Sequence, residues 1–181
     1  MLRIIAGKYR HLIIEAPSTN TTRPTTDKVR EAVMSSLGTS LIDATILDLF
    51  AGSGALGLEA LSRGAKKAIF CDNNYLAIKT IKDNINKLKI GEEVEIYKCS
   101  YKETLNQLKE KNEIIDILFL DPPYIKENVY QEVCDFLFDN NLLSNNAIIV
   151  KEWNKQIPID NRFNHHKSYS YGTINILIER R

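Results

Sequence analysis

TILDLFAGSGALGLEALSRG, residues 45–64, decides the fold class of this chain. The short, almost wholly apolar segment 45–50 is typical of a buried strand, and the glycine-rich turn Gly52–Gly57 then leads into a helical pattern. A second strand pattern follows and ends at Asp72, 20 residues beyond Gly52. A G-x-G-x-x-G turn between a strand and a helix, with an acidic residue at about this spacing, predicts a Rossmann-like nucleotide-binding unit.

Strand and helix patterns alternate through the rest of the chain. Repeated strand–helix units predict a parallel sheet with helices on both faces. The segments 162–171 and 173–179 surround Gly172 and predict a closing hairpin, one strand of which must be antiparallel. Near the start, 2–6 and 12–15 predict a small basic hairpin. Strands are expected at 45–50, 68–72, 94–98, 115–120 and 147–153, and helices at 27–37, 75–88, 102–109 and 128–139. Residues 52–63 are expected to form a glycine-rich turn that leads into a further helix.

Length and composition indicate one domain over 1–181, with a hairpin appendage at 1–16 and a core at 26–181. The hydrophobic fraction of 44% is sufficient for a packed core, and no apolar run approaches the length of a membrane helix. The first residues do not resemble a signal peptide. The three cysteines form no CxxC pair, so we expect reduced thiols, a cytoplasmic location, no membrane association and no metal site.

Charge is distributed unevenly although the net charge is only +1. Residues 1–30 carry six Lys or Arg against two acidic residues, and residues 151–181 carry six against three. The segment between them is therefore acidic. Basic ends around an acidic body indicate contact with a polyanion, and solvated termini without a partner are the alternative.

The ligand of the glycine-rich turn is either a dinucleotide or S-adenosylmethionine. Both contain a ribose whose hydroxyls Asp72 could bind. Asp48, just before the turn, favours S-adenosylmethionine because a carboxylate attracts the ammonium of its methionine moiety and repels a pyrophosphate. A tight turn of purely structural importance is the remaining interpretation.

The motif Asp121-Pro122-Pro123-Tyr124 directly follows the fourth strand of the core. Ligands of doubly wound sheets bind beyond the carboxyl ends of the strands, so this motif and the glycine-rich turn should face one crevice. The Asp121 carboxylate and the Pro122 carbonyl can accept both hydrogens of an aromatic amine, which makes its nitrogen more nucleophilic. Tyr124 can stack on a base that has left its helix. The motif therefore predicts methylation of an exocyclic base amine, and a simple Pro-Pro turn is the alternative.

With these motifs the chain resembles the RsmD-type methyltransferases, which form N2-methylguanine in the 16S RNA of the bacterial small ribosomal subunit. The resemblance covers nearly the whole chain. It is carried by LRIIAGKYR (2–10), RPTTDKVREAV (23–33), LDLFAGSGALGLEALSRGA (47–65), FLDPPY (119–124) and YGTINILIER (171–180).

The resemblance implies a seven-stranded Rossmann-like class I methyltransferase fold with reversed last strands and a small N-terminal hairpin. It implies S-adenosylmethionine as the donor, direct transfer to guanine N2, and 16S ribosomal RNA within a small subunit as partner; we expect a monomer. By position, the catalytic residues are Asp121, Pro122 and Tyr124. The cofactor-binding residues are Arg23, Thr25, Asp48, Phe50, Gly52, Gly54, Asp72, Asn73, Ser100 and Tyr101. The hairpin residues Arg3, Lys8 and Arg10 are the candidates for RNA contact.

Two positions depart from the family pattern. His11 stands where a glycine is common, and Ser100 stands where Asp or Asn is common. Three other functions stay open: a DNA adenine or cytosine amino-methyltransferase, a protein-glutamine methyltransferase, and a non-catalytic RNA-binding module. The first usually carries an inserted recognition region for which this chain has little room, and the second typically has NPPY in place of the motif at 121–124.

Overall fold

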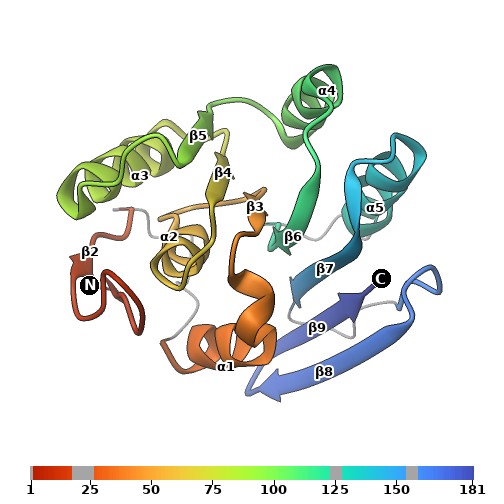
Figure 1. Cartoon of the computed structure of the whole chain (residues 1–181), viewed down its shortest axis with the longest axis horizontal. Helices are drawn as coiled ribbons and strands as arrows, with labels where there is room; N and C mark the ends of the chain where they lie inside the picture. Colours follow the sequence, from red (N-terminus) through yellow and green to blue (C-terminus); the bar gives the residue numbers. More distant parts are fainter. Residues whose placement is uncertain (1, 18–26, 123–127, 154–158) are drawn as a thin grey trace.

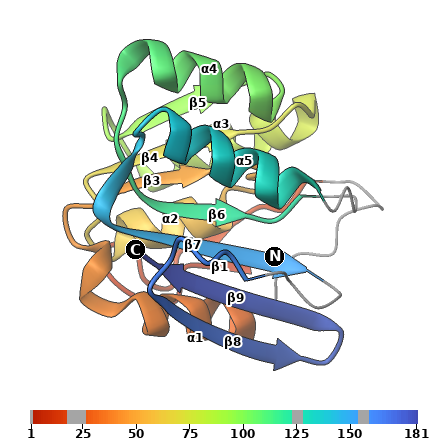
Figure 2. The same cartoon turned by 90° about the vertical axis from the view of Figure 1, so that its right-hand side faces the viewer.

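The computed structural model describes residues 2–17, 27–122, 128–153 and 159–181. Within these ranges seven strands form one sheet in the order β5-β4-β3-β6-β7-β9-β8. Neighbouring strands from β5 to β7 are parallel, whereas β9 is antiparallel to both β7 and β8 (Figures 1 and 2). This arrangement confirms the expected Rossmann-like sheet with a reversed strand near its end. The strands are β3 (Thr45–Asp48), β4 (Lys67–Cys71), β5 (Val94–Tyr97), β6 (Ile115–Leu120), β7 (Leu143–Trp153), β8 (His165–Tyr171) and β9 (Ile174–Arg180).

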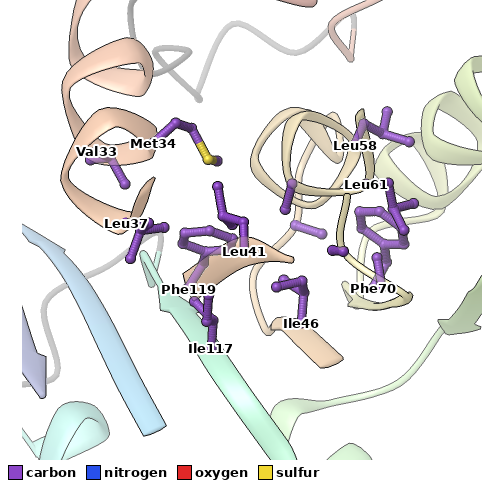
Figure 3. Packing of buried hydrophobic residues seen from close by; sticks show 14 of the residues in the cluster. Val33, Met34, Leu37, Leu41, Ile46, Leu58, Leu61, Phe70, Ile117 and Phe119 are labelled. Carbon is purple, nitrogen blue, oxygen red and sulfur yellow. The ribbon is translucent and has the colours of Figure 1, made fainter. Parts of the chain in front are cut away.

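Helices cover both faces of the sheet (Figure 1). The first three pack on one face, and the last two pack on the other. Figure 3 shows Val33, Met34 and Leu37 against Phe119 and its neighbours on the first face. Full burial of such side chains contributes about 1.5–3 kcal/mol each. The helices are α1 (Asp27–Leu37), α2 (Ala55–Ser62), α3 (Tyr75–Leu88), α4 (Tyr101–Lys111) and α5 (Asn128–Asp139).

The order of connections reverses between β3 and β6. From β3 the chain proceeds outward through β4 and β5, and it then returns to β6 on the other side of β3. A parallel sheet forms its ligand-binding crevice beyond the carboxyl ends of the strands at such a reversal. Asp48 ends β3 and Asp121 follows β6, so the topology brings these two carboxylates to the same place.

Some boundaries differ from those expected. Strand β7 begins at Leu143 rather than at 147, because Leu143 pairs with Ile115 ahead of a register shift that the polar residues Ser144–Asn146 occupy. Helix α2 begins at Ala55, after the expected glycine-rich turn, since Gly52 and Gly54 have φ angles of +54° and +77° that a right-handed helix does not accommodate.

The N-terminal hairpin contains only two short strands, β1 (Leu2–Arg3) and β2 (Ile13–Ile14), in place of the longer ones expected. A 3₁₀-helix that the sequence did not predict, η1 (Gly38–Leu41), follows α1. No helix in the described ranges has the length and apolar character needed to span a membrane.

Candidate active site

The glycine-rich loop lies between the ends of β3 and β4. Two of the hydrogen bonds that fix its backbone run from Ala51 N to Cys71 O at 2.9 Å and from Gly54 N to Ala51 O at 2.7 Å. A Cβ atom on Gly57 would lie 2.4 Å from the Phe70 ring, whereas one on Gly52 would meet no atom within 4 Å. Gly57 is therefore required for packing of α2 on the sheet, and Gly52 borders open space that a ligand could fill.

Asp72 ties this loop to the start of α3. Its Oδ2 accepts a hydrogen bond from Gly52 N at 2.9 Å, and its Oδ1 accepts one from Asn74 N at 2.8 Å. Each carboxylate oxygen has a second lone pair, so Asp72 can still accept from ligand hydroxyls. Asn73 lies next to it and is exposed.

Asp48 is buried behind the loop, with 4% of its surface exposed. Its Oδ2 accepts a hydrogen bond from Gly57 N at 3.2 Å. Burial, with a smaller contribution from the negative charge of Asp72, raises the pKa of Asp48 to about 7 against the lowering effect of the hydrogen bond from Gly57 N. A cation bound nearby would stabilise the ionised form.

Asp121 enters the same crevice from the end of β6. Burial raises the pKa of Asp121 well above its usual range, and the charges of Glu152 and Asp48 raise it further. Asp121 therefore lies within electrostatic reach of both acidic side chains. Pro122 is half-buried beside it. The sequence reasoning did not single out Glu152, although a charged residue in the apolar segment AIIVKEW is a signal that could have identified it.

Aromatic residues border the crevice near α4. The rings of Phe50 and Tyr101 are 5.6 Å apart, and the Tyr101 hydroxyl donates to Glu132 at 2.7 Å. Ser100 caps α4: its Oγ accepts from Glu103 N at 3.3 Å, and Ser100 N donates to Glu103 Oε2 at 2.9 Å. The Ser100 hydroxyl therefore caps α4. The sequence predicted only a cofactor contact for this residue, not a structural role.

Three predicted site residues lie outside the described ranges: Arg23, Thr25 and Tyr124. The described candidates Asp48, Gly52 and Asp72 come together around the glycine-rich loop, and Asp121 adjoins them. The rings of Phe50 and Tyr101 contact each other near the same loop.

The N-terminal hairpin is docked on α2 through two side chains that the sequence reasoning missed. Glu59 is fully buried and accepts hydrogen bonds from Ile5 N at 2.8 Å and Ala6 N at 3.0 Å. Ser62 Oγ accepts from Tyr9 N at 2.9 Å. A buried acidic residue within the otherwise apolar pattern of α2 was the available signal. Arg3, Lys8 and Arg10, the predicted RNA contacts, are exposed on this hairpin.

Asn84 of α3 connects the end of the hairpin to the glycine-rich loop. This side chain is fully buried. Its Oδ1 accepts from Glu15 N at 2.7 Å, while its amide donates to Glu15 O at 3.0 Å and to Ser53 O at 3.1 Å. One side chain therefore holds the candidate RNA-binding segment and the candidate cofactor loop together.

The basic C-terminal segment was expected to contact a polyanion, but most of its charged groups have partners within the molecule. Lys151 is buried against Glu179 at 2.5 Å, and Arg162 pairs with Asp160 at 2.6 Å. Arg180 and Arg181 donate to the backbone carbonyls of Ser36 and Leu143. Most positive groups of the described tail therefore have partners within the molecule, which weakens the tail as a candidate for phosphate contact.

The sheet order, the reversed β9, the glycine-rich loop after β3 and the Asp121 loop after β6 together define the Rossmann-like fold of class I S-adenosylmethionine-dependent methyltransferases. The profile of the family described as Conserved hypothetical protein 95 matches residues 2–179. The chain belongs to this family, the RsmD family.

Similar proteins agree with this assignment. Ribosomal RNA small subunit methyltransferase D of Escherichia coli (strain K12) is 36% identical over 151 residues, which is 83% of this chain and 74% of that protein. The protein of the same name from Haemophilus influenzae is 36% identical over 159 residues, or 87% and 81% of the two chains. The solved structure of yhhF from Escherichia coli superposes with a TM-score of 0.87 at 32% identity, covering 99% of this chain and 97% of that one.

Proposed function

We propose that this chain transfers a methyl group from S-adenosylmethionine to N2 of a guanine in the 16S RNA of the small ribosomal subunit. The observation that carries the proposal is the position of Asp121-Pro122 beside Asp48 and the glycine-rich loop, at the reversal between β3 and β6. The RNA target is supported by the relatives named ribosomal RNA small subunit methyltransferase D.

The residues of the crevice fit the cofactor. The buried Asp48 carboxylate suits the ammonium group of the methionine moiety, and the open space at Gly52 admits its backbone. Gly54 is proposed to line the same end of the cofactor, although a Cβ atom there would lie 3.2 Å from the side chains of Phe70 and Ile81. Asp72 would bind the ribose hydroxyls. Phe50 would line the methionine end of the cofactor. Asn73, Tyr101 and the remaining acceptor capacity of Ser100 would surround the adenine. Arg23 and Thr25 are proposed to complete the site.

S-adenosylmethionine, when bound, supplies an electrophilic methyl group attached to a positively charged sulfur. Asp121 and the Pro122 carbonyl each accept one hydrogen of the target amine, which concentrates the lone pair on its nitrogen. That lone pair forms the new N–C bond, while the electrons of the broken C–S bond stay on sulfur. Asp121, directly or through water, takes the displaced proton, and its raised pKa favours this role. Tyr124 is proposed to stack on the base.

The RNA is proposed to contact the hairpin residues Arg3, Lys8 and Arg10. These exposed cations would neutralise phosphates, while a structured RNA within the subunit supplies the remaining positioning. We propose that the protein acts as a monomer in the cytoplasm.

The test is transfer of labelled methyl groups to small subunits isolated from a strain lacking this gene. Digestion of the RNA and identification of the modified nucleoside should show N2-methylguanosine. Duplex DNA offered under the same conditions should remain unmodified. Methylation of adenine or cytosine, or the absence of label from the RNA, would contradict the proposal.

A further inference from the structure

We propose that Glu152 selects guanine by accepting a hydrogen bond from its N1–H while Asp121 and Pro122 hold the adjacent N2 amine. This inference rests on the proposed function and names a specificity-determining residue within that site.

Strand register places Glu152 alongside Asp121. In the parallel pair β6·β7, Phe119 lies next to Val150 and Leu120 lies next to Lys151. Asp121 directly follows the end of β6, and Glu152 is the next residue of β7. Neighbouring strands are about 4.8 Å apart, so the two backbones are adjacent at the mouth of the crevice.

Both carboxylates belong to the same face of the sheet. Side chains alternate between faces along a strand, so Asp121 shares the face of Phe119, and Glu152 shares that of Val150. Phe119 and Val150 belong to one core cluster, as does Ile176, which pairs directly with Glu152 from β9. This is also the face of Ile46 and therefore of Asp48.

The neighbouring lysine does not neutralise this pair. Lys151 belongs to the opposite face by the same alternation and forms a buried ion pair with Glu179 at 2.5 Å. The charge of Glu152 raises the pKa of Asp121, an effect second only to burial, and it also raises the pKa of Tyr130. Asp121 therefore experiences Glu152 as a nearby negative charge.

The backbone at Glu152 is held in place from the side of α5. The Tyr130 hydroxyl donates to Glu152 O at 2.7 Å, and the Tyr130 ring packs 5.6 Å from the ring of Trp153. A fixed backbone limits the positions of the side chain, which is half-buried at the crevice. A residue whose backbone is held in this way can recognise one edge of a base, because its position is fixed before the ligand binds.

The chemistry of the bases determines which one fits two adjacent carboxylates. In guanine, the N2 amine lies next to N1–H, so two neighbouring groups are donors. In adenine and cytosine, the amine lies next to an unprotonated ring nitrogen, which would repel a carboxylate. A carboxylate accepts hydrogen bonds and, when ionised, donates none. Glu152 would therefore stabilise guanine and disfavour the other two amino bases at this site.

The experiment compares guanine with 2-aminopurine at the methylated position of a semi-synthetic small-subunit RNA. 2-Aminopurine keeps the amine at C2 but has an acceptor at N1. The full-length wild-type protein should methylate guanine about 100-fold faster, as removal of a charge-assisted hydrogen bond predicts. Glu152→Gln, whose amide can donate to N1, should reduce this preference at least about tenfold. Calorimetric binding of S-adenosylmethionine should be unchanged in this variant.

The matched control is Asp139→Asn, which removes an exposed carboxylate at the end of α5 distant from the crevice. Its preference should equal that of the wild type. A Glu152→Gln protein that keeps the wild-type preference, or one that loses S-adenosylmethionine binding, would overturn the assignment of Glu152. A wild-type protein that methylates neither RNA would instead contradict the proposed function itself.

Discussion

Asp48 lies behind the glycine-rich loop as a buried carboxylate that accepts a hydrogen bond from Gly57 N at 3.2 Å. Ionising this group without a bound cation is unfavourable, which is why its pKa rises to about 7. The free protein is therefore less stable because of this position, and the proposed cofactor would offset the effect through its ammonium group. Functional residues that reduce the stability of the free protein are common in binding sites.

We expect Asp48→Asn to stabilise the free protein. The folded state holds a proton on Asp48 that the unfolded chain releases, so wild-type stability falls as the pH rises from about 4 to 7. The variant does not titrate at this position and should be up to about 4 kcal/mol more stable than the wild type above pH 7. Urea unfolding of both proteins at several pH values measures the difference. A constant difference between pH 4 and pH 8 would show that Asp48 does not titrate as described.

Residue positions at strand ends could be predicted from sequence, because strand patterns are clear and parallel strands present their carboxyl ends together. Asp48, Asp72 and Asp121 were identified in this way. Glu152 was not, since its closeness to Asp121 depends on the register between β6 and β7. Register is a property of paired strands, and no single segment of the sequence reveals it.

At the scale of secondary-structure elements, the N-terminal hairpin is attached to the core by side chains rather than by a sheet. Glu59 and Ser62 hold its first part on α2, and Asn84 holds Glu15 at its end. Gly7 permits the close approach of the hairpin backbone to α2, because a Cβ atom on Gly7 would lie 1.7 Å from Ser62 O. The hairpin therefore has a defined position relative to the glycine-rich loop.

Asn84→Ala should weaken binding of S-adenosylmethionine several-fold and reduce stability by about 1–3 kcal/mol, because it leaves Glu15 N and Ser53 O without this partner. Calorimetry and urea unfolding measure the two effects. The control is Asn86→Ala, an exposed position two residues further along α3. Equal cofactor affinity of the two variants would show that Asn84 does not position the loop.

The elements with strong periodic patterns were predicted closely, and α3, β6 and α5 have the expected bounds. The start of β7 was missed because Ser144–Asn146 are polar and join the strand only through a bulged pairing with β6. The pattern S-x-x-E at Ser100 and Glu103 is also typical of a capping box, which the structure contains, whereas Ser100 was predicted only as a ligand contact.

For the whole molecule, the structure separates two basic regions that look alike in sequence. The described tail uses Lys151, Arg162, Arg180 and Arg181 in internal contacts. The hairpin presents Arg3, Lys8 and Arg10 to solvent. Contact with a polyanion is therefore expected at the hairpin, beside α2 and α3 (Figure 1).

Charge reversal of Lys8 and Arg10 to Glu should weaken RNA binding and flatten its dependence on salt. Each phosphate that the variant no longer neutralises should reduce the slope of log affinity against log salt by about 1. Filter binding to small-subunit RNA between low and physiological salt provides the measurement. The matched control reverses the exposed Lys66 and Lys109, which changes the net charge equally. Identical slopes for both double variants would show that the RNA does not bind at Lys8 and Arg10.

The central claim is that Asp121 acts on the target amine in a crevice whose other residues bind the cofactor. Methyl transfer from labelled S-adenosylmethionine to small subunits, measured for Asp121→Ala beside calorimetric cofactor binding, tests it most directly. Transfer should be abolished in this variant, while the Kd for S-adenosylmethionine stays close to that of the wild type. Turnover near the wild-type rate in the Asp121→Ala protein would contradict it.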